Sequence, residues 1–296
     1  MENIEIFSEL PEEEKNRFGK LIKSLRSKLI RAPKEIVEDI FEKNNQLIEE
    51  VKSNHNISDL ISDLREKIWQ SYLIDESKFN VEVVKEISVN WDTPKYILEN
   101  LLDRDIFANQ NKEALIKNMH EICGTYAGYI SPYIYNLCLS NTNSRRSRAG
   151  TTFEQIIYKI YKAFGYPFVS QGEIGKEAFE EKGLGKKVDS LLPSIDAFEK
   201  RRDKVVIGTM KTTLRERWQE VVEELSRTDL PSIYLLTIDD DISESKAEQM
   251  SKHNLILVVP KNVKQNQSLI KKHNVIDFET FFLEEIPDKI NYWNNQ

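Results

Sequence analysis

Two ionisable side chains, Asp189 and Lys211, occupy strand-like segments where metal-assisted chemistry could use them. The segment 204–211 is rich in β-branched residues, and a period of two places Lys211 on the same face as Val205 and Ile207. A carboxylate can hold a hard cation through its oxygens, and such a cation offsets phosphate charge and lowers the pKa of a bound water. A lysine can hold the attacking water or stabilise developing charge. The pair is a candidate for phosphodiester hydrolysis, although a single Asp and a single Lys are more often ordinary surface residues.

The carboxylate that usually accompanies such a lysine is absent from its expected position. Metal-dependent nucleases commonly carry Asp or Glu two residues before the lysine, and this chain has Thr209 there. Glu223 and Glu224 follow Lys211 by 12 and 13 residues, in a segment with helical periodicity. Glu224 flanks the apolar stripe of this expected helix, so it can point back at the strand end. The alternative is an exposed pair of glutamates on an amphipathic helix.

The charged run Arg215-Glu216-Arg217 follows Lys211 closely and is expected in the first turn of a helix over 213–226. Arginine can bind guanine O6 and N7 with two hydrogen bonds, and a carboxylate can accept a hydrogen bond from cytosine N4. A helix N-terminus also favours a nearby phosphate. The run therefore predicts a reader of DNA bases next to the lysine. A simpler interpretation is that Thr213 and Glu216 form a capping box on an exposed helix.

Three motifs within residues 140–265 resemble those of the CCGG family of type II restriction endonucleases. The motifs are Arg146-Ser147-Arg148-Ala149-Gly150-x-x-Phe153-Glu154, Lys187-x-Asp189-x-x-x-Pro193 and Lys211-x-x-x-Arg215-Glu216-Arg217-Trp218. The separations also agree, with 35 residues from Glu154 to Asp189, 22 from Asp189 to Lys211 and 13 from Lys211 to Glu224. One departure is Val188, because the family places proline before the aspartate. Each motif alone is weak, and their combination is specific.

The resemblance implies an α/β fold of the PD-(D/E)xK restriction-endonuclease type, with a central mixed β-sheet flanked by helices. It also implies Mg²⁺-dependent cleavage of double-stranded DNA at a palindrome with CC and GG halves. The bases inside and outside these halves stay open, so CCGG, a flanked CCGG, CCNGG and CCWGG are all compatible. A palindromic target implies a two-fold symmetric homodimer in which each subunit cuts one strand, and a higher oligomer is also compatible.

The same resemblance implies roles for individual residues in catalysis. Asp189 and Glu224 would bind the metal, with Glu224 taking the place left vacant at Thr209. Lys211 would position or activate the attacking water. Glu154 would be an additional acid that acts on the metal through water.

The resemblance also implies the residues that contact DNA. Arg215, Glu216 and Arg217 would read the CC:GG core. Arg145, Arg146 and Arg148 would contact the DNA backbone, or Arg148 would instead brace the active site.

Periodicity predicts the order of elements along the chain. Helices are expected over 11–53, 60–72, 95–103, 111–121 and 126–139, with a less regular stretch over 73–93. A further helix is expected to open at Gly150. Short β-prone runs are expected over 166–170, 187–192, 204–211, 232–238 and 255–259, and later helices over 213–226, 242–252 and 278–294. This order predicts an N-terminal helical domain over 1–100 and a catalytic domain over 101–296.

Composition excludes several classes of protein. The chain has 296 residues, of which 40% are hydrophobic and 31% charged, so it can bury a core. No apolar run approaches the roughly 20 residues that span a bilayer, and no secretory signal is visible at the N-terminus. Cys123 and Cys138 cannot form a disulfide framework or a cysteine-rich zinc site. A cytoplasmic location is therefore expected.

The charge is unevenly distributed along the chain. The net charge is −7, yet residues 141–230 carry 17 Lys and Arg against 14 Asp and Glu. A basic middle in an acidic chain suggests a surface that faces a polyanion. Ordinary solvated helix faces are the simpler explanation of this charge when it is considered alone.

Two other functions are compatible with the motifs. A DNA repair nuclease of the same fold would cut without sequence preference, so its specificity would not depend on Arg215 or Arg217. A non-catalytic DNA-binding protein would not need the acidic and basic groups expected in catalysis, and their joint presence argues against it.

Overall fold

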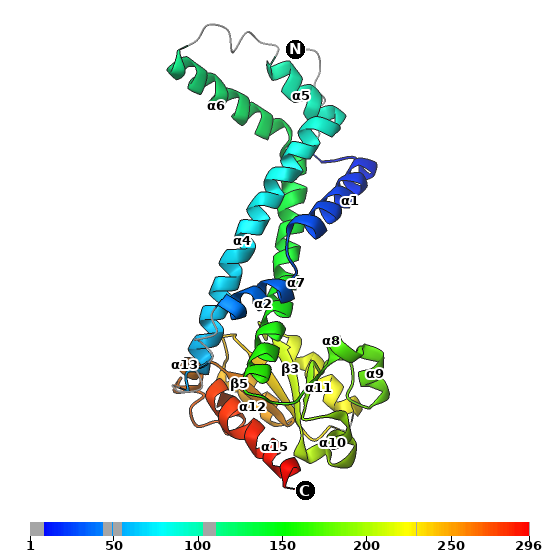
Figure 1. Ribbon diagram of the computed structural model, residues 1–296, viewed down its shortest axis with the longest axis vertical. Helices are drawn as coiled ribbons and strands as arrows, with labels where there is room; N and C mark the ends of the chain where they lie inside the picture. The colour runs from blue at the N-terminus through cyan, green and yellow to red at the C-terminus, as the bar shows by residue number, and fades with distance from the viewer. Residues whose placement is uncertain (1–8, 44–48, 50–54, 103–110, 229, 296) are drawn as a thin grey trace. The chain divides into compact units, whose positions relative to one another are not determined.

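The chain divides into two compact units. The computed structural model describes residues 9–43, 49, 55–102, 111–228 and 230–295 (Figure 1). Unit 1 comprises 1–32 and 69–147, and unit 2 comprises 33–68 and 148–296. Two of the three boundaries between the units fall inside long helices, α4 (Ile57–Asn90) and α7 (Ser131–Ala163), and the third falls directly before Pro33. The expected division into a helical domain over 1–100 and a catalytic domain over 101–296 stays a prediction.

The described residues of unit 1 are predominantly helical. The unit contains α1 (Glu12–Leu29), α5 (Asp92–Leu102), α6 (Lys112–Tyr129), the C-terminal part of α4 and the N-terminal part of α7. Its core includes Phe18, Trp91 and Tyr133, whose rings meet edge to face with centroids 5.3–5.9 Å apart. Helices α5 and α6 confirm the helices expected over 95–103 and 111–121.

Two expected helix boundaries are wrong. The less regular stretch expected over 73–93 lies mostly within α4, a helix of 34 residues. Its β-branched residues suit a helix because Phe79, Val83 and Ile87, spaced by four, are all buried. The helix expected to open at Gly150 is continuous with the preceding one as α7. Burial on either side outweighs the roughly 1 kcal/mol that a glycine costs inside a helix.

Unit 2 is built around a six-stranded mixed sheet. Its strands are β1 (Val169–Ser170), β2 (Ser190–Leu192), β3 (Val206–Lys211), β4 (Ile233–Thr237), β5 (Leu255–Val259) and β6 (Val275–Asp277). They pair in chain order, antiparallel from β1 to β3 and parallel from β3 to β6. The sheet, flanked by helices, confirms the expected α/β class. Strand β6 was not predicted.

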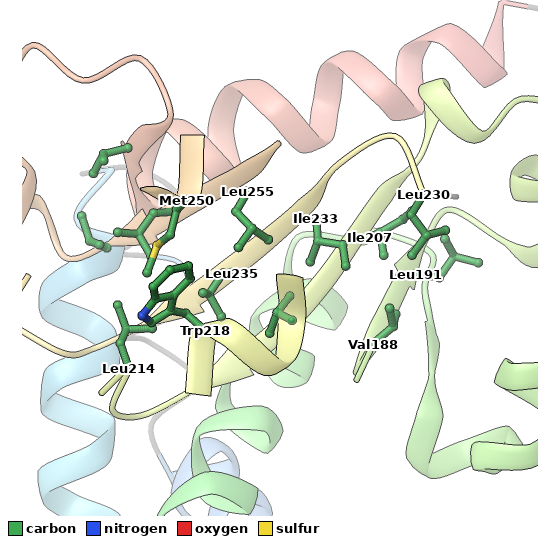
Figure 2. Packing of buried hydrophobic residues seen from close by; sticks show 14 of the residues in the cluster. Val188, Leu191, Ile207, Leu214, Trp218, Leu230, Ile233, Leu235, Met250 and Leu255 are labelled. Atoms are coloured by element: carbon green, nitrogen blue, oxygen red, sulfur yellow. The ribbon is translucent and has the colours of Figure 1, made fainter. Parts of the chain in front are cut away.

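A hydrophobic cluster of unit 2 lies between the sheet and helices that include α11 (Arg217–Thr228) and α12 (Glu244–Ser251). Figure 2 shows Trp218 of α11 close to Leu214 and Leu235, with Met250 of α12 beside them. Ile233 and Leu235 of β4 both belong to this cluster, as the two-residue period of a strand requires. The core therefore fixes the start of α11 against the sheet.

The other face of the sheet packs against aromatic residues. Tyr234 of β4 contacts Phe281, and Tyr161 of α7 contacts Phe282, with ring centroids 5.3 and 5.5 Å apart. Phe281 and Phe282 belong to a π-helical turn (Phe281–Glu285) between α14 (Phe278–Thr280) and α15 (Ile286–Asn294). These three elements confirm the closing helical segment expected over 278–294.

Short helices complete unit 2. They are α2 (Pro33–Lys43), α8 (Gln171–Ile174), α9 (Lys176–Glu181), α10 (Ile195–Lys200), the 3-10 turn η1 (Arg202–Lys204) and α13 (Lys261–Lys264). The part of the expected helical region 11–53 that follows Lys43 lies outside the described residues, except for Glu49. Among the described helices, none combines the length and the apolar character needed to cross a membrane.

Candidate active site

The pairing of β2 with β3 brings Asp189 to the end of β3 that carries Lys211. The two strands are antiparallel, and Ser190 of β2 is in register with Gly208 of β3. Asp189, directly before Ser190, donates its backbone N–H to the carbonyl of Gly208 at 2.9 Å. Two residues separated by 22 positions in the chain therefore become neighbours through the ladder of the sheet.

The side chains of Asp189 and Lys211 are in direct contact. Lys211 Nζ lies 3.3 Å from Asp189 Oδ2 and also donates to the carbonyl of Met210 at 3.0 Å. The same Oδ2 accepts the backbone N–H of Met210 at 2.6 Å. Only 15% of the Asp189 side chain and 17% of the Lys211 side chain are exposed. The pair is sheltered and held in place, and it is still reachable from solvent.

Thr209 takes part in the same network, at the position where a carboxylate is usual. Its Oγ1 donates to Asp189 Oδ2 at 3.2 Å and accepts from Lys211 Nζ at 3.2 Å. The hydroxyl bridges the two ionised groups without adding charge. The pattern around Lys211 thus contributes one acid where the usual arrangement contributes two.

Glu154 of α7 is electrostatically coupled to this pair. Burial and the negative charge of Asp189 raise the pKa of Glu154 to about 7, and the positive charges of Lys211 and Lys176 oppose this rise. The carboxyl also borders a cavity of about 180 Å³. Glu154 therefore borders this cavity and is partly protonated at neutral pH.

Two residues that the sequence analysis did not identify hold Asp189 in place. Tyr158, one helical turn after Glu154, donates its hydroxyl to the carbonyl of Asp189 at 2.9 Å. Burial raises the pKa of Tyr158, so its hydroxyl stays a donor at neutral pH. Gln171 donates its backbone N–H to the same carbonyl at 3.0 Å and its side-chain amide to the carbonyl of Val188. The four-residue spacing from Glu154 was an available signal for Tyr158, whereas nothing in the sequence indicated Gln171.

Glu224 lies in a different set of contacts from the other three predicted catalytic residues. It is buried on α11, accepts a hydrogen bond from the backbone N–H of Lys186 and pairs with Arg227 at 2.9 Å. Gly185 allows this approach, because a Cβ there would collide with the Glu224 carboxylate. The hydrogen bonds of Glu224 among the described residues do not reach Asp189 or Lys211. In that part of the chain, no group of three or more His, Cys, Asp or Glu side chains is arranged to hold a metal ion.

The run Arg215-Glu216-Arg217 occupies a turn and the first residue of the helix. Helix α11 begins at Arg217, and Arg215 has a φ of +32°. The expectation that all three residues lie in the first helical turn is therefore wrong, and so is the alternative that Thr213 and Glu216 form a capping box at the helix start. The buried side chain of Leu214 draws the chain into the core before the helix begins. All three charged residues of the run are exposed.

Arg146 and Arg148 both lie on α7. Arg146 belongs to unit 1 and is exposed, and Arg148 belongs to unit 2 and is half-buried. The preceding arginine, Arg145, has a structural role in unit 1, because it forms an ion pair with the buried Glu76 of α4. The roles of Arg146 and Arg148 toward DNA stay predictions.

The chain matches a known protein family and a curated relative. Residues 112–282, more than half of the chain, match the family described as EcoRII C terminal. Over 165 residues the chain is 39% identical to the type II restriction enzyme SsoII of Shigella sonnei. That match covers 55% of this chain and 53% of SsoII, so the chain spans about half the length of this curated relative.

Solved structures resemble the fold along most of the chain. Metal-depleted Ecl18kI in complex with uncleaved DNA has a TM-score of 0.74 and 27% identity, covering 95% of this chain and 87% of that chain. A complex of the restriction endonuclease PspGI with substrate DNA has a TM-score of 0.53 and 18% identity, covering 90% and 95% respectively. At this lower identity, the PspGI likeness supports the fold alone.

Proposed function

The chain belongs to the EcoRII C-terminal family, and from this membership we propose that it is a type II restriction endonuclease that hydrolyses both strands of DNA at a defined sequence. Membership also confirms the resemblance to CCGG-family enzymes that the motifs indicate. The observation that carries the proposal is the contact between Lys211 and Asp189 at the end of β3. The relatives support it, because SsoII is named a type II restriction enzyme and the Ecl18kI structure contains DNA.

Mg²⁺ is the proposed cofactor, and the donor atoms around Asp189 suit it. The hydrogen bonds that the described residues make to the Asp189 carboxylate all end on Oδ2, which leaves Oδ1 for a cation. Mg²⁺ needs only one or two protein carboxylates, because waters and phosphate complete its coordination. Glu224 is the proposed second ligand, since it hydrogen-bonds Lys186 in the segment that leads to Asp189. When bound, Mg²⁺ offsets phosphate charge and lowers the pKa of a bound water.

The other two proposed catalytic residues handle the proton and the developing charge. Lys211 is aimed at the site by its hydrogen bonds to Thr209 and to the carbonyl of Met210, so its ammonium can hold the attacking water or stabilise the pentacovalent phosphate. Glu154, with a pKa near 7, can exchange a proton with a water in the adjoining cavity at neutral pH. No covalent enzyme intermediate is required.

The proposed target is a palindrome with CC and GG halves. Arg215, Glu216 and Arg217 are exposed and begin a few residues after Lys211, so bases read there lie close to the phosphate that is cut. Arg146 and Arg148 are proposed contacts to the DNA backbone. A two-fold symmetric site implies a homodimer with one active site for each strand. The expected cytoplasmic location also stays a proposal.

Cleavage of DNA of known sequence tests this function. We expect the purified protein with Mg²⁺ to produce discrete fragments, and mapping their ends identifies the recognition sequence and the cut position. Asp189→Ala and Lys211→Ala are expected to abolish cleavage and leave binding to the mapped site. Asp196→Ala and Lys200→Ala are matched controls, because these two residues are exposed on α10 of the same unit.

The outcomes separate the alternative functions. Retained cleavage in Asp189→Ala or Lys211→Ala would refute the proposed active site. Fragments with random ends would favour a repair nuclease of the same fold. Binding without cleavage by the wild-type protein, with any divalent metal, would favour a non-catalytic DNA-binding protein.

A further inference from the structure

An aspartate outside the proposed catalytic set, Asp239, contacts the turn that carries the proposed base readers. Asp239 Oδ2 accepts a hydrogen bond from the backbone N–H of Leu214 at 2.7 Å, and Leu214 directly precedes Arg215. We propose that Asp239 is a positioning residue for sequence recognition, which sets the path of residues 214–217 and thereby the place of the reader side chains. This inference rests on the proposed function and adds a specificity-determining residue to it.

The sheet brings Asp239 to this turn. Strands β3 and β4 are parallel, and Lys211 is in register with Thr237. The segments that follow the two strands therefore leave the same edge of the sheet side by side. Asp239 is two residues beyond Thr237, and Leu214 is three residues beyond Lys211. The contact is a direct consequence of this parallel register.

Asp239 is itself held firmly. Its backbone N–H donates to Oγ1 of the buried Thr237 at 3.1 Å. Its Oδ1 accepts the backbone N–H of Asp241 at 3.1 Å, which closes a local Asx turn. Both carboxylate oxygens are thus used in backbone hydrogen bonds. Such a group is suited to fixing another segment.

The turn needs such support because its backbone is unusual. Arg215 has a φ of +32°, in the left-handed region that side chains other than glycine seldom adopt. Leu214 anchors the turn from one side, with its side chain fully buried close to Trp218 (Figure 2). Asp239 anchors it from the other side through the N–H of the same residue. After these anchors, the side chains of Arg215, Glu216 and Arg217 are exposed.

Because Asp239 is acidic, a role in positioning the turn can be distinguished from a role in general affinity for DNA. A carboxylate near a DNA-reading surface repels phosphate, so it cannot increase non-specific binding by attraction. If Asp239 positions the turn, its removal lowers discrimination between sequences and leaves non-specific binding unchanged or tighter. A residue needed only for folding would not produce this opposite pair of effects.

The experiment compares Asp239→Ala and Asp239→Asn with Asp240→Ala in the full-length protein. Asp240 is the adjacent exposed aspartate and serves as the matched control. After the wild-type digest has mapped the site, kcat/KM is measured with Mg²⁺ on duplexes carrying that site and on duplexes with one base pair changed. The ratio of kcat/KM on the mapped site to kcat/KM on the changed site measures discrimination. Asp239→Ala is expected to lower this ratio roughly tenfold, within the range for a lost specificity contact. Asp239→Asn keeps one acceptor oxygen for two N–H partners, so it is expected to lower this ratio less than Asp239→Ala does. Asp240→Ala is expected to keep the wild-type ratio.

A double-mutant cycle with Arg217→Ala makes the test independent of overall stability. If Asp239 acts through the readers, the losses of discrimination in Asp239→Asn and Arg217→Ala are expected not to add. Full additivity, an unchanged ratio, or the same loss in Asp240→Ala would overturn the inference. Random cleavage by the wild-type protein would instead refute the proposed function, whereas a defined wild-type site with an unaffected Asp239→Ala ratio would refute the role of Asp239 alone.

Discussion

The end of β3 and the turn that follows it lie a few residues apart, and they are built differently. At the strand end, Asp189 and Lys211 are mostly buried and are held by sheet register and by several hydrogen bonds. In the turn, the side chains of Arg215 and Arg217 are exposed, and the backbone is held by one buried side chain and one carboxylate.

This difference teaches how one segment can serve two purposes. Chemistry at a phosphate needs groups fixed in a sheltered place, because charge interactions weaken in water. Base recognition needs side chains that reach outward into a groove. We therefore expect substitutions at the strand end to change the rate of cleavage on every sequence, and substitutions in the turn to change the ratio between sequences.

The largest effect is expected from Lys211→Met, which removes the ammonium and keeps most of the side-chain volume. We expect the rate constant of cleavage in single-turnover experiments to fall by roughly 10²–10³-fold, because one preorganised charge is lost. Binding to the mapped site, measured without Mg²⁺, is expected to stay near the wild-type value. Lys200→Met is the control, and cleavage by Lys211→Met within a few-fold of wild type would contradict the role of the strand end.

The second prediction concerns the pH dependence of stability at the strand end. Burial and Asp189 raise the pKa of Glu154 from 4.5 to about 7 in the folded protein. Between these values the folded protein keeps a proton that the unfolded chain has released, so its free energy of unfolding falls as pH rises and levels off above pH 7. The total loss is at most about 3 kcal/mol for a shift of this size.

Glu154→Gln tests this dependence. The variant cannot titrate at this position, so we expect it to be more stable than the wild type at pH 8 and to equal it near pH 4.5. Urea unfolding in EDTA between these pH values measures the difference. Superimposable pH profiles for the two proteins would show that folding does not raise the pKa of Glu154.

The third prediction concerns the turn. Arg217→Ala is expected to cost about 1–3 kcal/mol of discrimination against a changed base pair, with little change in the maximal rate on the best substrate. Arg217→Lys keeps the charge and loses the planar fork, so it should restore non-specific binding and not discrimination. Equally weakened binding to all sequences in Arg217→Ala would indicate a phosphate contact.

The smallest effect is expected from Tyr158→Phe. This change removes the hydroxyl that donates to the carbonyl of Asp189, and one such hydrogen bond contributes about 0.5–1.5 kcal/mol. We expect the free energy of unfolding to fall by this amount and kcat to fall a few-fold on all sequences alike. Tyr166→Phe is the control, because Tyr166 donates its hydroxyl to the carbonyl of Phe282 in the same unit. If Tyr158→Phe changed the ratio of the cleavage rates on different sequences, the strand end would also affect discrimination between sequences.

Much of the fold was predictable from local patterns. The β-prone runs over 204–211, 232–238 and 255–259 became β3, β4 and β5, because alternation and β-branched residues are local properties. The continuity of α4 and the turn before α11 were not predictable, because burial of residues distant in the chain decides both. Leu214, for example, is drawn into the core by contacts with other elements.

The candidate site divides in the same way. Residue types and spacing were enough to propose Asp189, Lys211 and the arginines of the turn as site residues, since their side chains are suited to the proposed chemistry and fall in the motifs. Contacts between strands and helices were needed to place Thr209 between the two charges, to connect Tyr158 and Gln171 to Asp189, and to direct Glu224 toward Lys186. Chemistry belongs to single side chains and can be read along the chain, whereas hydrogen-bond partners depend on strand register and packing between segments that are far apart in it.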